Sequence, residues 1–194
     1  MHGSWKSSIL VIVFLGLTGL THAIELGKVQ QRYAKLNDFS AVFKQETFQV
    51  IANKTVLFDG KVSYKRNSGV RMDVMSPERQ ILILKGSTVL IVLPEQGTSQ
   101  VQEIPPEISA QNILGFFAGF TSIEEQYAVQ ETADRLILTP KTGTGSISVW
   151  VDTDGLIERI LLKDAMGNIS DIRLSGYRFN MNISDEIFRE KTGG

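Results

Sequence analysis

The feature that most constrains the fold is the alternation of apolar and polar residues in short segments that are separated by turns. The clearest example is residues 57–74, where the alternation stops at Asn67-Ser68-Gly69 and then resumes. Its apolar positions are Val62, Tyr64, Val70, Met72 and Val74. A period of two places these side chains on one face of a sheet, and the Asn-Ser-Gly sequence is typical of a turn. The segment therefore predicts two antiparallel strands that share one apolar face.

Arg66 interrupts this pattern, because counting by twos from Val62 places it on the apolar face. An unpaired charge buried there would be very costly, so its guanidinium needs hydrogen-bond acceptors. The other interpretation is an arginine at the rim of the sheet, with its stem buried and its head in water. The strand pattern alone favours the rim arginine.

Short apolar or alternating segments recur along the rest of the chain, and most are joined by short turns. We expect about ten or eleven strands from twelve candidate segments. The candidate segments are 39–45, 55–66, 70–75, 80–85, 88–93, 98–104, 127–131, 136–139, 147–151, 156–162, 169–174 and 177–179. Short connections imply one strongly curled antiparallel sheet, and no linker divides residues 24–194, which we expect to form a single domain.

Two segments predict helices. Residues 24–37 place Leu26, Val29, Tyr33 and Leu36 at helical spacing on one face. Residues 107–120 follow a proline pair and suit a second helix. Its apolar residues are Ile113, Leu114, Phe116, Phe117 and Phe120. Two glycines within it cost about 1 kcal/mol each relative to alanine, so this helix is either an aromatic core helix or a mobile lid.

These elements together predict an α+β, mainly β fold, in which an unclosed antiparallel barrel carries a helical lid over an apolar cavity. We expect the cavity to be lined by the five apolar residues of the 57–74 segment and to be covered by the five apolar residues of the second helix. A sheltered apolar cavity of this kind suits acyl chains.

The first 23 residues have the features of a signal peptide. Lys6 precedes an apolar run from Ile9 to Leu20, and Thr21-His22-Ala23 offers a small residue at each position that a signal peptidase reads. This run is too short to span a bilayer. We expect cleavage after Ala23 and an exported, soluble, monomeric mature chain that starts at Ile24.

The composition narrows the possible chemistry. The chain has no cysteine, and its two histidines, His2 and His22, both lie in the predicted signal peptide. A mature chain without His or Cys cannot use Ser-His-Asp or Cys-His catalysis, or zinc and haem sites of the usual kinds. We therefore expect no enzyme activity, no cofactor and no metal site.

The charges are nearly balanced. Removing Lys6 from the 20 Lys and Arg leaves 19 against 21 Asp and Glu, a net charge of 19 − 21 = −2. No basic tract is present, so the chain lacks the footprint of nucleic-acid binding and of an electrostatic membrane anchor.

Several segments, in this order, resemble the bacterial outer-membrane lipoprotein carrier family, LolA. They are 36–45, 60–66, 71–77, 136–140, 151–157, 167–168 and 182–188. The resemblance implies an unclosed antiparallel barrel with a helical lid. It also implies a periplasmic chaperone that accepts acylated lipoproteins from an inner-membrane ABC release complex and passes them to an outer-membrane receptor.

The family resemblance also bears on Arg66, because an arginine at the end of the second strand holds the lid helices in that family. Arg66 matches this position, so the resemblance favours a lid latch. Two departures are visible: Asn67 stands where the family usually has proline, and the chain stops soon after Phe188. The handover partner is therefore the family's receptor, a different protein, or none. The alternative function on the same architecture is a periplasmic lipid-sensing or envelope-signalling domain.

Overall fold

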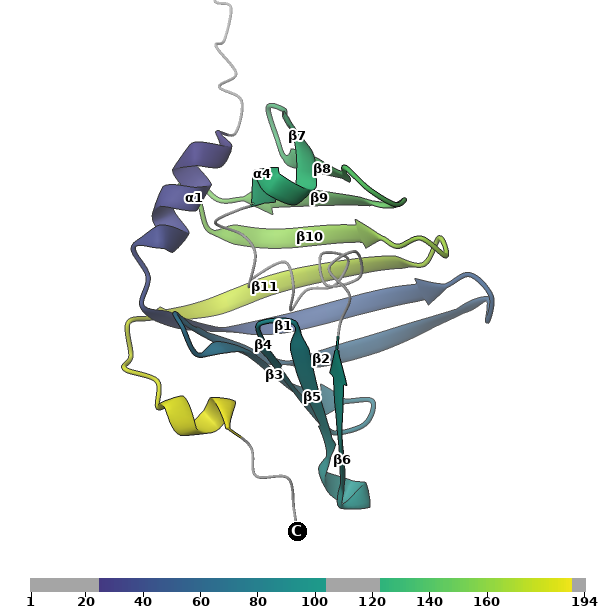
Figure 1. The fold of residues 1–194 in the computed structure, drawn as a ribbon. Helices are drawn as coiled ribbons and strands as arrows, with labels where there is room; N and C mark the ends of the chain where they lie inside the picture. Colours follow the sequence, from purple (N-terminus) through teal and green to yellow (C-terminus); the bar gives the residue numbers. More distant parts are fainter. Residues whose placement is uncertain (1–24, 104–122, 190–194) are drawn as a thin grey trace, which may run out of the picture.

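The computed structural model describes residues 25–103 and 123–189, and one antiparallel sheet dominates them (Figure 1). Its eleven strands follow the order β6-β5-β4-β3-β2-β1-β11-β10-β9-β8-β7. The strands are β1 (Asp38–Gln49), β2 (Lys54–Lys65), β3 (Gly69–Ser76), β4 (Gln80–Lys85), β5 (Thr88–Leu93), β6 (Thr98–Glu103), β7 (Tyr127–Glu131), β8 (Leu136–Pro140), β9 (Ser146–Val151), β10 (Ile157–Lys163) and β11 (Ile169–Phe179). The helical elements are α1 (Leu26–Ala34), η1 (Pro94–Gln96), α4 (Ile123–Gln126) and η3 (Asp185–Phe188).

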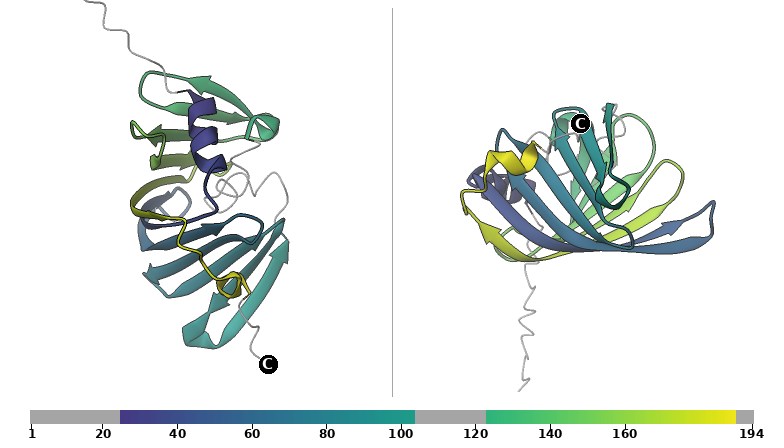
Figure 2. Two further views of the ribbon diagram at one scale, coloured as in Figure 1. Left: turned by 90° about the vertical axis from the view of Figure 1, so that its left-hand side faces the viewer. Right: turned by 90° about the horizontal axis from the view of Figure 1, so that it is seen from below.

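The sheet curls strongly but does not close. Figure 2 shows it as an open trough, and β6 and β7 are its two edges. Every strand pairing in the described residues is antiparallel. The predicted fold class, a mainly β unclosed antiparallel barrel, is confirmed.

Because apolar and polar residues alternate along the strands, they lie on opposite faces of this sheet. One core cluster joins buried residues of β2 and β3, such as Val62 and Val70, to residues of β8–β10, such as Leu138 and Ile160. Strands from both halves of a curled sheet meet only inside the curl, so this cluster marks the inner face. Apolar residues of α1 belong to the same cluster, which places the helix over the inner face at one end of the trough.

The outer face has a small core of its own. Ile81 and Ile83 alternate with the inner-face residues of β4, and they pack against Phe188 of η3. The C-terminal segment therefore covers the outer side of β3–β5. The sequence did not predict its helical element, η3.

The long β1–β2 hairpin depends on a glycine. The ladder pairs every residue of β1 with a residue of β2, from Asp38 with Lys65 to Gln49 with Lys54. At Gly60 the pairing of β2 with β3 shifts, and an added Cβ would lie 2.0 Å from the Asp73 carbonyl oxygen. Only a residue without a side chain allows this close approach of the two backbones.

The structure corrects the division of the last strand. The sequence predicted separate strands at 169–174 and 177–179, but β11 is continuous from Ile169 to Phe179. Gly176 adopts a φ of 61°, and the register of β11 against β1 shifts beside it. A bulge keeps the strand paired through a residue that the sequence suggested was a break.

The predicted signal peptide and the whole predicted helix at 107–120, with its five apolar residues, lie outside the described residues. The described part of the chain has no helix that is both long and apolar enough to span a bilayer.

Candidate functional site

The five residues that were predicted to line a cavity lie together on the inner face. Val62 pairs with Met72 across the β2–β3 ladder, and Tyr64 pairs with Val70. Val62 and Val70 are fully buried, Met72 and Val74 are 5% and 6% exposed, and Tyr64 is partly buried. Their clustering follows from the alternation, whereas their role as lipid contacts remains a prediction.

An aromatic cluster continues this surface beneath α1. The Phe39 ring stacks on Tyr64 at 5.4 Å between centroids and lies 5.8 Å from both Tyr33 and Tyr177. Sequence reasoning named Tyr64 but not Phe39 or Tyr177. The alternation of β1 and the predicted strand at 177–179 indicated that Phe39 and Tyr177 lie in strands. Their contact depends on the pairing of β1 with β11, which the sequence of a single strand does not reveal.

The hydroxyl groups of two tyrosines fix α1 to the sheet. Tyr177 Oη donates to the Ile157 carbonyl oxygen at 2.7 Å, and Tyr33 Oη accepts the Ile157 amide at 3.2 Å. The two hydroxyl oxygens are 3.4 Å apart. Burial raises the pKa of both Tyr33 and Tyr177. Both hydroxyls therefore stay protonated at neutral pH and act as hydrogen-bonding anchors.

Arg66 holds the C-terminal end of α1. The structure ends β2 at Lys65, and the exposed Arg66 side chain reaches the C-terminal end of the helix. Its Nη2 donates to the carbonyl oxygens of Ala34 and Leu36, the latter at 2.8 Å. These carbonyls lie at the negative end of the helix and have no partner within it, so a guanidinium there is favourable.

The helix thereby links the two halves of the sheet. Lys28 and Tyr33 contact the β9–β10 region, and the Leu26 amide donates to Glu131 of β7. Arg66 follows β2 in the other half. Contact of Arg66 with residues 113–120, the predicted lid, remains a prediction because those residues lie outside the described ones.

Asn67 adopts a conformation that proline cannot. Its φ is 64°, whereas a proline ring fixes φ near −65°. Asparagine tolerates this left-handed region better than most residues. The departure from the family pattern after Arg66 is thus matched by a different turn in this chain.

Polar residues beside Arg66 hold the C-terminal segment. The Arg71 guanidinium forms an ion pair with Asp73 and donates to the Ile187 carbonyl oxygen at 2.8 Å. The Lys65 ammonium lies 2.8 Å from Asp185, and this hydrogen bond, with a second from Ser68, lowers the pKa of Asp185. The buried carboxylate of Asp38 accepts the Met181 amide at 2.7 Å. Sequence reasoning missed these roles.

A polar pocket of about 330 Å³ opens beside these residues. Its lining is Lys65, Arg66, Asn67, Ser68, Lys85, Asp185, Phe188 and Arg189. It lies at the β2–β3 turn and is mostly charged, so it is distinct from the apolar inner face. In the described residues no group of three or more His, Cys, Asp or Glu side chains is arranged to hold a metal ion.

The comparison with known families decides the assignment. The profile of the family described as "Outer membrane lipoprotein carrier protein LolA" matches residues 34–191. The chain belongs to the LolA family. Among its relatives, the outer-membrane lipoprotein carrier protein of Glaesserella parasuis is 25% identical over 191 residues, covering 92% of this chain and 91% of that protein. The protein of the same name from Haemophilus influenzae strain PittEE is 25% identical over 185 residues, covering 93% and 89%.

Solved structures show the same fold. A LolA superfamily protein from Nitrosomonas europaea superposes with a TM-score of 0.52 at 15% identity, over 84% of this chain and 94% of that one. An uncharacterized conserved protein from Thermus thermophilus gives 0.52 at 9% identity, over 86% and 91%. At these identities the similarity shows the fold alone.

Proposed function

We propose that this protein is a periplasmic chaperone that binds the acyl chains of lipoproteins released from the inner membrane and carries them to the outer membrane. The observation that carries the proposal is the apolar inner face of a sheet that stays unclosed, in a chain of the LolA family. Cavity-lining residues are proposed to be Val62, Tyr64, Val70, Met72 and Val74. The proposed lid residues are Ile113, Leu114, Phe116, Phe117 and Phe120.

The energetics match such a task. Each acyl methylene moved out of water contributes about 0.8 kcal/mol, so a lipid anchor held in water costs on the order of tens of kcal/mol. A carrier must shelter these chains and still release them. Apolar side chains that close over the inner face after release recover about 1.5–3 kcal/mol each, which makes release less unfavourable.

In this proposal, Arg66 controls the balance between the closed and the open form. The inner face beneath α1 is almost inaccessible to solvent, so acyl chains enter only when the helical cover moves. The bonds from Arg66 to the end of α1 are then made in the closed, empty form and lost in the loaded one. They favour release and oppose loading.

The partners in this proposal follow from the family. We infer that lipoproteins arrive from an inner-membrane ABC release complex. The outer-membrane acceptor is a receptor protein or the membrane itself, and the different turn at Asn67 leaves both open.

The test uses the protein exported from a bacterial host and a synthetic acylated lipopeptide with a fluorescent label. The wild-type chain should bind the lipopeptide and not the same peptide without acyl chains. Val70→Glu with Met72→Glu should abolish binding, because a carboxylate on this face is buried beside the acyl chains. Met75→Glu is the matched control, since Met75 follows on the same strand with 61% of its side chain exposed.

A second variant guards against loss of folding. Met72→Phe adds volume without charge and should weaken lipopeptide binding while the circular dichroism spectrum stays that of wild type. Full binding by both inner-face variants in a folded state would contradict the proposal. A wild-type chain that copurifies with a transmembrane regulator and transfers no lipoprotein would favour the lipid-sensing alternative.

A further inference from the structure

Two hairpin tips carry most of the apolar surface that the fold leaves in water. Ten large hydrophobic side chains are exposed in the described residues. Six of them gather on the β1–β2 and β10–β11 hairpins: Phe48, Val50, Ile51, Leu57, Met166 and Ile169. Ile51 is 86% exposed and Met166 65%, which makes the two turns the most exposed part of this set.

Specific contacts hold the two tips side by side. The Val50 amide donates to Asn168 Oδ1 at 2.9 Å, which joins the first turn to the second. Phe48 pairs with Ile169 across the β1–β11 ladder. Val50 Cγ2 lies 3.7 Å from the position that a Cβ on Gly167 would take. The six residues, called the apolar tip below, are therefore one surface although they come from two distant parts of the sequence.

The apolar tip projects from the sheet. β1 and β2 have 12 residues each and β11 has 11, more than any other strand described. Figure 2 shows the β1–β2 hairpin reaching beyond its neighbours. Since Asp38 pairs with Lys65 at one end of the hairpin and Gln49 with Lys54 at the other, the tip is as far from α1 and Arg66 as the hairpin allows.

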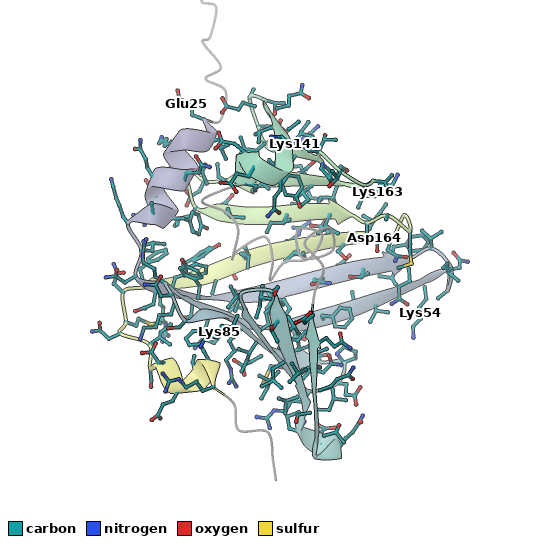
Figure 3. The ribbon with its side chains drawn as sticks, viewed as in Figure 1. Glu25, Lys54, Lys85, Lys141, Lys163 and Asp164 are labelled. Atoms are coloured by element: carbon teal, nitrogen blue, oxygen red, sulfur yellow. The ribbon has the colours of Figure 1, made fainter. Side chains whose placement is uncertain are left out.

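Lysines flank the tip. Figure 3 shows Lys54 and Lys163 at this end of the molecule, with Asp164. Both lysines are exposed, and neither forms an ion pair with another described residue. The Asp164 carboxylate is occupied within its own turn, where it accepts the amides of Met166 and Asn168 and the Asn168 side-chain amide at 2.8–2.9 Å. The charges nearest the two turns, Lys54 and Lys163, are thus positive and free to face a partner, whereas the exposed acids Glu46 and Asp59 lie further back along β1 and β2.

We propose that the apolar tip is a membrane-contact site that inserts into the interfacial region of a lipid bilayer. Apolar side chains at a projecting end, beside lysines, suit the surface of a bilayer, where anionic headgroups lie above an apolar interior. A second copy of this chain fits less well, because a stable dimer covers about 800 Å² on each partner and two narrow turns give a convex tip instead of a broad face. The inference goes beyond the proposed function and does not depend on it.

This contact differs from an electrostatic membrane anchor, which depends on a tract of basic residues. The longest run of consecutive basic residues is the pair Lys65-Arg66, and within residues 24–194 no sequence window is long and apolar enough by itself to indicate a membrane contact. The surface arises only when the β1–β11 pairing brings residues 48–57 beside residues 166–169. The contact is therefore mainly apolar, and the lysines add a preference for anionic lipid.

The test is co-sedimentation of the exported protein with vesicles. Its N-terminus is first checked by mass spectrometry, so that residues 1–23 make no contribution. Wild-type protein should sediment with phosphatidylethanolamine vesicles and more strongly when phosphatidylglycerol is added. Ile51→Ser with Met166→Ser should lower the partition coefficient about tenfold or more, because two inserted apolar side chains are lost. Lys54→Gln with Lys163→Gln should lower it about fivefold per lysine, on the anionic vesicles only.

Two controls make the result specific. Val101→Ser with Met181→Ser removes exposed apolar side chains elsewhere and should leave the partition unchanged. Met72→Phe, which changes the inner face without adding a charge, should also bind vesicles as wild type does, which separates the tip from the inner face. The proposal is overturned if wild-type protein does not sediment, if Ile51→Ser with Met166→Ser binds equally well, or if this variant changes only self-association in analytical ultracentrifugation.

Discussion

At the scale of single residues, polar groups and not apolar ones decide where α1 sits. Leucine and valine side chains of α1 pack on the inner face, but burial is not directional, and a helix held by it alone can slide or tilt. Arg66 and Tyr33 both fix the C-terminal turn of α1, Arg66 through two carbonyl oxygens and Tyr33 through Ile157. Each contact pairs a group that burial or the end of a helix would otherwise leave unsatisfied.

The first prediction concerns Arg66. Arg66→Leu removes both bonds to the end of α1, which contribute about 1–2 kcal/mol in total because the guanidinium is partly solvated. The open, binding-competent form then gains population, so the apparent affinity for lipopeptide should rise by up to about thirtyfold. Loading should survive, and transfer of loaded lipoprotein to outer-membrane vesicles should slow. Both are measured with the labelled lipopeptide.

Arg66→Lys is the matched variant. It keeps the charge but lacks the planar fork that reaches two acceptors, so it should restore the transfer rate only in part. Poor loading with normal transfer in Arg66→Leu would show that the latch acts in the opposite direction. Normal loading and transfer would leave Arg66 as a rim arginine.

The second prediction concerns buried tyrosines at high pH. Burial raises the pKa of Tyr127 to about 12, and it also raises the pKa of Tyr177. A tyrosine in the unfolded chain ionises near the usual tyrosine pKa of 10.0. Between pH 10.0 and about 12, the unfolded chain has lost tyrosine protons that the folded chain keeps. The free energy of unfolding therefore falls as the pH rises above 10.

The measurement is the urea midpoint at about pH 9 and about pH 11. The midpoint of the wild-type chain should be lower at the higher pH. Tyr127→Phe and Tyr177→Phe each remove one ionisable group, so each should show a smaller decrease. An equal decrease in all three proteins would mean that other groups cause the alkaline loss.

At the scale of elements, the curl of the sheet depends on local breaks in regular pairing. β2 changes register against β3 at Gly60, and β11 changes register against β1 beside Gly176. Such irregularities increase the local twist of a strand. A sheet of eleven regular strands would not bend as sharply around one core, and the inner face would then lack its shelter.

The third prediction tests this at Gly60. Gly60→Ala places a methyl group 2.0 Å from the Asp73 carbonyl oxygen and 2.9 Å from the Phe43 ring. Neither the β3 backbone nor a buried ring can move away cheaply, so the change should cost about 3 kcal/mol or more and lower the denaturation midpoint. Urea unfolding followed by circular dichroism measures it.

Gly27→Ala is the matched control. Gly27 lies in α1 with no atom within 4 Å of an added methyl group, and alanine favours a helix over glycine by up to about 1 kcal/mol. The control should therefore be neutral or stabilising. If both glycine variants unfold at the wild-type urea concentration, close backbone approach at Gly60 is not a source of the fold's specificity.

At the scale of the whole molecule, alternation predicted the sheet well because the side-chain period of a strand is a local property. Strands at 80–85, 88–93 and 127–131 have the bounds that the sequence predicted, and Val62, Val70, Met72 and Val74 are buried on one face as expected. Pairing is not local. The bulge in β11, the role of Asp38 and the apolar tip all depend on residues more than a hundred positions apart, and no single segment carries that information.

The arrangement of the contacts also predicts which part of the molecule moves. β1 is paired on both sides, with β2 along its whole length and with β11, so the middle of the sheet is a continuous ladder. α1 has nine residues, and its last amides, at Lys35 and Leu36, bond only to carbonyls of the preceding turn. Opening at α1 therefore breaks few bonds, whereas opening the β1–β11 seam breaks many.

The fourth prediction follows from this asymmetry. On addition of a triacylated lipopeptide, hydrogen exchange should speed up at residues 34–37, because the loaded form lacks the closing bonds from Arg66. Exchange in β1, β2 and β11 should stay slow, because those strands keep their ladders. Mass spectrometry of exchanged peptides measures both regions, and the same peptide without acyl chains is the control. Arg66→Leu without lipopeptide should already show the faster exchange at residues 34–37. Faster exchange in β1 and β11, with residues 34–37 unchanged, would show instead that the sheet itself opens to admit the cargo.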